Sequence, residues 1–144
     1  MVVEHLFQDR FAPVCSPLLR IASPDDLRQA TLIHFEWGQY ERTDERASVW
    51  PHCFEAAGMG SMDLDAGLWF TEELHAVHAA IAGQGIGLLS LTLVQEELAA
   101  GILVQPFELE LDSFSYDLVY SPRAIDRPGT MLLRDWILEQ FVTG

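Results

Sequence analysis

The stretch AAIAGQGIGLL (79–89) carries glycines at three alternate positions, Gly83, Gly85 and Gly87. In a dinucleotide-binding fingerprint a strand precedes the glycines, and the helix that follows them holds the phosphate on its free N–H groups. Here the order is reversed, because the helical pattern TEELHAVHAAIA (71–82) comes first and an apolar run follows. The glycines then lie beside helix carbonyl groups, which repel phosphate. We expect no nucleotide here; we expect Gly83 or Gly85 to end the helix in a left-handed conformation, and Gly87 to allow a close approach within a strand.

The helix predicted before the glycines has a recognisable start and an apolar stripe. Thr71 is its expected N-cap, and Glu72 and Glu73 occupy the first turn, where the helix dipole favours acidic side chains. The side chains that recur at helical spacing, and that we expect to be buried, are Leu74, Val77, His78 and Ile81.

Outward from this segment, strands and helices alternate along the chain. The expected strands are 11–17, 31–35, 68–70, 86–90, 102–107 and 113–122, and the segment 36–48 reads as a loop. The expected helices are 23–30, from near Trp50 to Gly58, 71–82, 92–101 with Thr92 and Gln95 spaced as a capping box, and 128–141. This alternation predicts an α/β fold with a mostly parallel sheet flanked by helices.

Composition and charge limit the function. The chain has 144 residues, 49% of them hydrophobic, which suits one ordinary domain with a real core. No apolar run reaches the length of about 18 residues that a membrane span needs, and residues 1–10 do not read as a secretory signal. The net charge of −14 repels phosphate backbones and anionic membranes, so we expect no direct contact with nucleic acid or membrane.

The residues that could support catalysis or metal binding lack partners in the sequence. Cys15 and Cys53 do not form a disulfide framework, which favours a reducing cytoplasm. Cys15 as a thiol nucleophile would need a histidine and an oxyanion site that no motif supplies. His75 and His78 are spaced to share a metal, but no third ligand accompanies them. The sequence thus predicts no catalytic residue, no metal and no cofactor.

The ordered set of motifs resembles the effector-binding domain of LysR-type transcriptional regulators. HAAIAGQGIGLLSLTLVQEELAAGILVQPF (78–107) is similar to that family's helix, glycine turn, strand, helix and strand ending in Pro-Phe. LFQDRFAPVCSPLL (6–19) is similar to its crossover strand, and WPHCFEAAGM (50–59) to its W-x-x-W-L-x-A-A-G helix, with Phe54 in place of the second tryptophan. YDLVYSPRAIDRPGTMLLRDWILEQ (116–140) is similar to the returning strand and final helix. The subgroup with the greatest similarity contains glycine-cleavage and β-lactamase regulators.

The resemblance implies a fold like one lobe of a type 2 periplasmic binding protein. On this basis residues 1–144 are part of an effector-binding domain. The second lobe covers about 15–115; the crossover strands 6–14 and 113–121 and the final helix 128–141 belong to the first lobe. The resemblance also implies that the helix-turn-helix DNA-binding domain and the opening part of the first lobe lie outside this chain. Strands 6–14 and 113–121 would expose unpaired edges, so we expect a homo-oligomer that forms through them.

The resemblance further implies a small-molecule effector bound between two lobes. The candidate contacts are Trp37 in the loop after the strand 31–35, Thr71, Glu72 and Glu73 at the helix start, and Tyr116 on the returning strand. Many effectors of the family are carboxylates, which two glutamates would repel. Either the effector is neutral or cationic, or Glu72 and Glu73 point to solvent and serve only helix stability.

The expected function is effector sensing in a bacterial transcription regulator, with no chemistry of its own. An effector held between the lobes would favour one lobe arrangement and so re-space the DNA-binding domains of an oligomer. Two alternatives stay open. One is a solute-binding lobe without a transcriptional role, and the other is a small thiol enzyme that uses Cys15.

Overall fold

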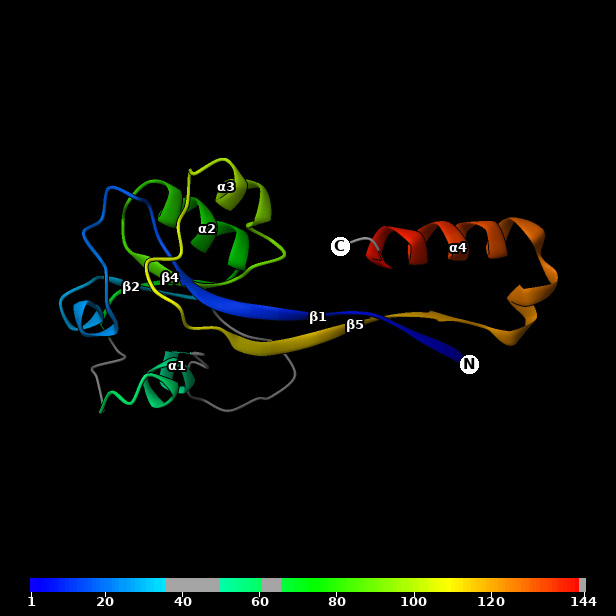
Figure 1. Ribbon diagram of the computed structural model, residues 1–144, viewed down its shortest axis with the longest axis horizontal. Helices are drawn as coiled ribbons and strands as arrows, with labels where there is room; N and C mark the ends of the chain where they lie inside the picture. The colour runs from blue at the N-terminus through cyan, green and yellow to red at the C-terminus, as the bar shows by residue number, and fades with distance from the viewer. Residues whose placement is uncertain (36–49, 61–65, 143–144) are drawn as a thin grey trace. The chain divides into compact units, whose positions relative to one another are not determined.

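The computed structural model describes residues 1–35, 50–60 and 66–142. The chain forms two compact units. The terminal unit consists of Met1–Asp9 and Asp112–Gly144, and the central unit consists of Arg10–Leu111. Each unit is described separately below (Figure 1).

The strands form one sheet with the order β3-β2-β4-β1-β5. Their bounds are β1 Val2–Val14, β2 Leu32–Phe35, β3 Leu68–Phe70, β4 Ile86–Ser90 and β5 Leu111–Tyr120. β2 is parallel to both β3 and β4, whereas β1 runs antiparallel to β4, with a register from Phe11 opposite Ser90 to Val14 opposite Gly87. The α/β class and the single sheet flanked by helices are confirmed. The predicted parallel arrangement holds for β3, β2 and β4, and β1 makes the sheet mixed.

Helices cover both faces of the sheet in the central unit. The helices of the central unit are η1 Pro24–Arg28, α1 Trp50–Ala56, α2 Glu73–Ile81 and α3 Gln95–Ala99. The terminal unit contains η2 Pro122–Asp126 and α4 Pro128–Val142. Figure 1 shows α2 and α3 over one face and α1 on the other. Every residue of β2 and β4 is buried. The indole nitrogen of Trp50 donates to the carbonyl of Ile33 at 2.9 Å, which ties α1 to β2.

The glycine segment ends α2 as predicted. Gly83 has a φ of 74°. Its N–H donates to the carbonyl of Ala80, and the N–H of Gln84 donates to the carbonyl of Ala79, which is the Schellman pattern of bonds. Gly85 serves a different purpose, because a Cβ there would lie 2.4 Å from the carbonyl oxygen of Thr31. The glycines therefore allow α2 to end and β4 to lie close to the start of β2.

The predicted apolar stripe of α2 is wrong except at Val77. Leu74 and Ile81 are exposed, and so is His78, which we expected in the core. The buried side chains of α2 are instead Ala76, Val77, Ala79 and Ala80. Small side chains let the helix backbone approach the sheet closely, where larger side chains would not fit.

Two further local predictions are wrong. The segment 102–107 is not a strand, because in it only Val104 pairs, through an isolated bridge with Cys15. The helix predicted from Thr92 begins later: α3 starts at Gln95 with Val94 as its N-cap residue, and no side chain of Val94 caps it. The Ser90 hydroxyl accepts from the N–H of Leu93 at 3.2 Å, in the turn before the helix.

The terminal unit combines the first half of β1 with β5 and α4. The predicted long strand at 113–122 and the helix at 128–141 are confirmed, with slightly shifted ends. Arg134 of α4 donates from Nε to Glu4 of β1 at 2.7 Å, and the hydroxyl of Tyr120 of β5 donates to the same carboxylate at 2.9 Å. One carboxylate therefore joins all three elements of the terminal unit. None of the described helices is long and apolar enough to cross a membrane.

Candidate functional site

The carboxyl ends of β3, β2 and β4 meet at one edge of the central unit because these strands are parallel. Ligands of open α/β sheets bind outside this kind of edge. α2 begins there, directly after β3, and β4 ends there at Ser90. The edge therefore presents a helix N-terminus and a strand end side by side, and we treat it as the candidate effector-binding edge.

Glu73 connects these two features. Its Oε1 accepts a hydrogen bond from the N–H of Ser90 at 2.7 Å. Glu73 is half-buried, whereas Thr71 and Glu72 are exposed. Glu72, not the expected Thr71, is the N-cap residue, and its side chain caps no N–H group. Of the two glutamates, Glu73 therefore faces the strand end. Its carboxylate occupies the N–H of Ser90, to which an anionic ligand would otherwise bind.

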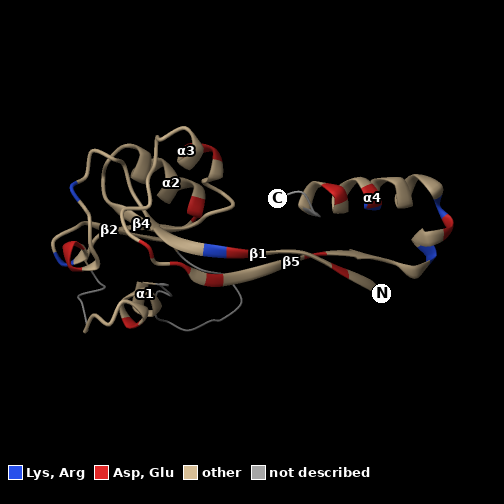
Figure 2. Cartoon of the chain, in the orientation of Figure 1, with Lys and Arg blue, Asp and Glu red and all other residues tan. Residues whose placement is uncertain are grey.

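β1 supplies a cation to the same edge. Phe11 of β1 lies opposite Ser90, and the carbonyl of the preceding Arg10 accepts from the N–H of Leu91 at 2.9 Å. The guanidinium of Arg10 bonds Glu110 at 2.8 Å and holds the pKa of that carboxyl below its ordinary value. In Figure 2, acidic positions are present on α1, α2 and α3 of the central unit. Because Arg10 is paired with Glu110, it is not an isolated positive charge at this edge.

The other predicted effector contacts are not brought to this edge by the described structure. Trp37 lies outside the described residues. Tyr116 belongs to β5 in the terminal unit, where its ring stacks on Phe7 with centroids 4.7 Å apart. Both therefore stay predictions. The sequence reasoning missed Ser90 and Arg10; the only signal for Ser90 was a polar residue at the end of the apolar run 86–89.

A buried histidine lies on β2, next to the edge strand β3. His34 of β2 stacks on Trp69 of β3, with ring centroids 4.3 Å apart. Its Nε2 lies 3.0 Å from the carbonyl oxygen of Ala66, an arrangement in which the ring N–H donates. Burial lowers the pKa of His34, so the neutral imidazole is favoured. Sequence reasoning placed this residue in a strand but assigned it no role.

The two cysteines are poor nucleophiles in this fold. Both are buried. Burial raises the pKa of the Cys15 thiol, and it raises that of Cys53 to about 12. Because the thiolate is the reactive form and a raised pKa favours the thiol, both cysteines have low nucleophilicity. Among the described residues, no group of three potential metal ligands occurs.

The family to which this architecture belongs follows from comparison with known proteins. The LysR substrate binding domain family matches residues 1–142. The chain therefore belongs to the LysR substrate-binding domain family, as the ordered motifs predicted.

Individual relatives agree with this assignment. The glycine cleavage system transcriptional activator of Escherichia coli K12 is 30% identical over 142 residues, which cover 94% of this chain and 44% of the activator. The HTH-type transcriptional activator AmpR of Rhodobacter capsulatus is 32% identical and is covered to 42%. The chain thus spans somewhat less than half the length of these relatives. Both carry the names of transcriptional regulators and neither that of an enzyme.

A solved structure shows the same fold. The effector domain of AmpR of Pseudomonas aeruginosa superimposes with a TM-score of 0.75 at 26% identity, covering 98% of this chain and 65% of that one. The effector-binding domain of Citrobacter freundii AmpR gives a TM-score of 0.77 at 22% identity. The architecture described above is therefore that of a LysR effector-binding domain.

Proposed function

We propose that this chain is the effector-sensing part of a bacterial LysR-type transcriptional regulator that acts in the cytoplasm. The family match over residues 1–142 is the observation that carries the proposal. The names of the relatives, which are transcriptional activators and regulators, support the transcriptional role. Effector binding would shift the population of domain arrangements and thereby the activity of attached DNA-binding domains.

We further propose how the chain divides between the two lobes of such a domain. The central unit, Arg10–Leu111, corresponds to the second lobe. The terminal unit contributes crossover strands and a final helix to the first lobe. The division of the chain at Asp9 and Asp112 lies close to the lobe boundaries that the resemblance implies.

The effector would contact the central unit at the carboxyl edge of β3, β2 and β4. The bond from the Ser90 N–H to Glu73 supports a neutral or cationic effector, because that amide is already engaged by a carboxylate. An anion at the start of α2 would meet the charge of Glu73 at close range. Thr71 and Glu72 are exposed at the same helix start and are available for contact.

A domain exchange tests the transcriptional role. This chain would replace the matching segment of the E. coli glycine cleavage activator, and a reporter gene under that activator's promoter would be measured in cells. We expect transcription to respond to a different small molecule from the one that acts on the unmodified activator. A chimera that is folded and occupies the promoter, yet leaves transcription unchanged across a broad metabolite panel, would contradict the proposal.

A ligand screen on the chain itself tests the effector class. Thermal unfolding would be recorded with matched series of carboxylates, their amides and the corresponding amines. We expect stabilisation by amides or amines rather than carboxylates, and loss of the preference for amines in Glu73→Gln. Glu55→Gln, at an exposed position of α1, is the control and should keep it. Greater stabilisation of the unchanged chain by carboxylates would argue against this assignment.

A further inference from the structure

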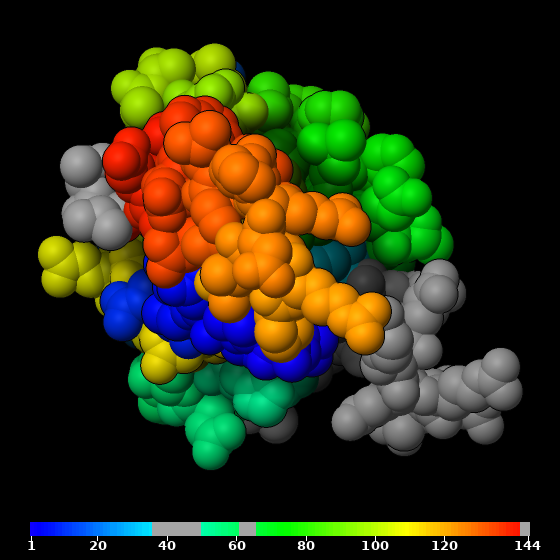
Figure 3. Space-filling model, turned by 90° about the vertical axis from the view of Figure 1, so that its right-hand side faces the viewer, coloured from blue at the N-terminus to red at the C-terminus, as the bar shows by residue number. Residues whose placement is uncertain are grey.

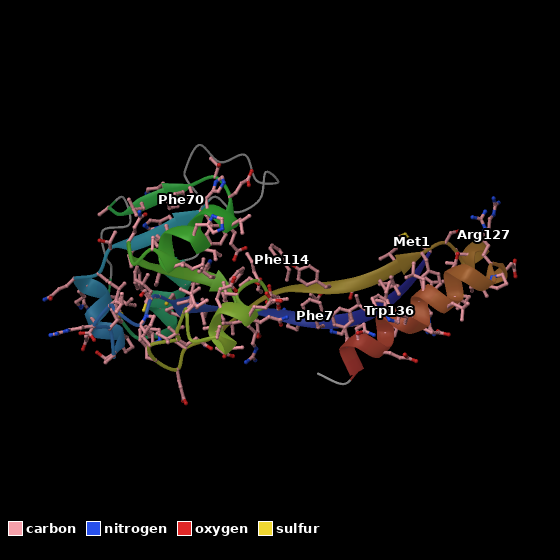
Figure 4. The ribbon with its side chains drawn as sticks, turned by 90° about the horizontal axis from the view of Figure 1, so that it is seen from above. Met1, Phe7, Phe70, Phe114, Arg127 and Trp136 are labelled. Carbon is pink, nitrogen blue, oxygen red and sulfur yellow. The ribbon has the colours of Figure 1, made fainter. Side chains whose placement is uncertain are left out.

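β1 and β5 connect the central unit to the terminal unit. β1 passes from one unit to the other between Asp9 and Arg10, and β5 does so between Leu111 and Asp112. The two strands are neighbours in the sheet and run side by side in Figure 4. We call these two places the junctions. Because the chain changes unit only there, a structural change in the central unit reaches the backbone of the terminal unit through a junction.

A salt bridge ties the two junctions together on the side of the central unit. The guanidinium of Arg10 donates from Nη1 to Oε2 of Glu110 at 2.8 Å, and Glu110 also accepts from Nε2 of Gln105 at 3.4 Å. The side chains of Arg10 and Glu110 are 54% and 36% exposed. Because exposed ion pairs contribute little to stability, we expect this pair to act mainly by fixing the position of one strand relative to the other.

The backbone of the same arginine is bonded to the candidate effector-binding edge. The carbonyl of Arg10 accepts from the N–H of Leu91 at 2.9 Å, one residue beyond the point where Phe11 lies opposite Ser90. Ser90 is buried, and its own N–H is held by the carboxylate of Glu73 at 2.7 Å. Two hydrogen bonds and the Ser90–Leu91 peptide bond therefore connect the start of α2 to a junction.

From these contacts we infer that Arg10 is a positioning residue of the effector response, which links the start of α2 to both junctions. Its carbonyl is bonded to the turn that Glu73 holds, and its guanidinium is bonded to Glu110. A ligand that engages Glu73 would thus change how firmly β1 and β5 are held where they leave the central unit. The inference rests on the proposed function for the place of the ligand, whereas the connection itself is a property of the unliganded chain.

A cycle of single and double substitutions that reads the pKa of Glu110 tests the connection. Carbon NMR of the side-chain carboxyl groups follows this pKa in the 144-residue chain. The Arg10 guanidinium holds the pKa of the Glu110 carboxyl below its ordinary value of 4.5, so Arg10→Met should raise it. Glu73→Ala should raise it as well, because the turn at Ser90 and Leu91 is released and Arg10 moves away from Glu110. In the Arg10→Met chain, adding Glu73→Ala should produce no further rise.

The sign of the change separates this connection from a general electrostatic effect. Loss of the negative charge at Glu73 would by itself lower the pKa of Glu110, which is opposite to the expected rise. Glu73→Gln removes the same charge but keeps an oxygen that can accept from the Ser90 N–H, so it should produce no rise. Glu73→Asp keeps the charge on a side chain that is one methylene shorter. It should reproduce the rise, and it replaces Glu73→Ala if that variant does not fold.

Arg123→Met is the matched control for Arg10→Met. Arg123 is an exposed arginine of η2. The segment that contains it, orange in Figure 3, lies at the surface of the terminal unit. Its substitution should leave the pKa of Glu110 unchanged. Amide NMR spectra would show that each variant is folded.

Two outcomes would overturn the inference. A pKa of Glu110 that rises in neither Glu73→Ala nor Glu73→Asp would show that the start of α2 and the junctions are independent. A rise that is equally large with and without Arg10 would show that the connection bypasses this residue. Both outcomes concern the unliganded chain, so they leave the ligand screen and the domain exchange as separate tests of the proposed function.

Discussion

At the residue scale, Gly83 and Gly85 meet different physical demands. Gly83 has a positive φ of 74°, which a residue with a Cβ adopts at a cost. Gly85 has no such φ, but its missing side chain leaves room for the carbonyl of Thr31, which also accepts the N–H of Ile86 at 2.9 Å. One glycine therefore acts through its own backbone and the other through contact with a neighbouring strand.

Alanine substitutions should distinguish the cost of a positive φ at Gly83 from the cost of a steric clash at Gly85. Gly83→Ala should lower the free energy of unfolding by about 1–2 kcal/mol, the usual cost of a left-handed residue with a Cβ. Gly85→Ala should cost more, because its Cβ would lie 2.4 Å from a backbone oxygen that cannot move without disturbing β2. Gly60→Ala, where a Cβ meets nothing within 4 Å, serves as the control. Urea unfolding measures all three, and equal effects at Gly83 and Gly60 would refute the interpretation.

His34 should make stability depend on pH. Burial lowers its pKa in the folded chain below the ordinary value of 6.5, so the unfolded chain takes up the proton more readily. The stability that neutral His34 contributes is complete above pH 6.5 and falls as the pH decreases from 6.5 towards the lower folded value. His34→Phe, which keeps a ring against Trp69, should reduce this dependence. The free energy of unfolding at several pH values between 7.5 and 5 measures it, and parallel curves for both proteins would contradict the prediction.

At the element scale, α2 shows how packing overrides hydrophobic periodicity. Leu74, Val77 and Ile81 recur at helical spacing, yet only Val77 is buried. The helix instead turns its alanines to the sheet, with Ala76 and Ala80 fully buried. The separation between helix and sheet decides the outcome, because a narrow space accepts methyl groups and rejects larger side chains.

Enlarging this alanine face should therefore destabilise the protein. Ala80→Leu inserts three carbon atoms into a closely packed space and should lower the free energy of unfolding by about 1–3 kcal/mol. His78→Leu adds a leucine at an exposed position of the same helix and should change stability little. Thermal and urea unfolding compare the two, and a destabilisation that is as large at His78 would show that the face was wrongly assigned.

At the scale of the whole molecule, the net charge bears on contact with DNA. The chain carries 22 acidic and 8 basic residues, and Arg10 and Arg134 are engaged in ion pairs within their units. A surface of this kind repels the phosphate backbone. The charge of this chain therefore disfavours contact with DNA.

The chain alone should not bind DNA. Fluorescence anisotropy with a labelled duplex at low salt, where electrostatic attraction is strongest, should show no binding. The domain-exchange chimera, which retains the DNA-binding part of the E. coli activator, is the positive control. Binding by the isolated chain that weakens with added salt would show a basic surface that the charge balance does not predict.

The sequence by itself determined the local boundaries, the α/β class and the family. Gly83 ends a helix and Ser23 begins one for reasons that lie within a few residues of chain, so their signals are readable from spacing alone. The order of these signals was specific enough to identify a LysR effector-binding domain. Of the candidate site, the sequence located Thr71, Glu72 and Glu73 at a helix start.

Only the tertiary structure decided which of these side chains face one another. The bond of Glu73 to the amide of Ser90 joins residues 17 positions apart, and no local pattern encodes it. The same holds for the segment 102–107, in which Val104 pairs with Cys15 only through an isolated bridge. Local signals depend on backbone preferences of neighbouring residues, whereas burial and hydrogen-bond partners depend on which surfaces come together when the sheet assembles.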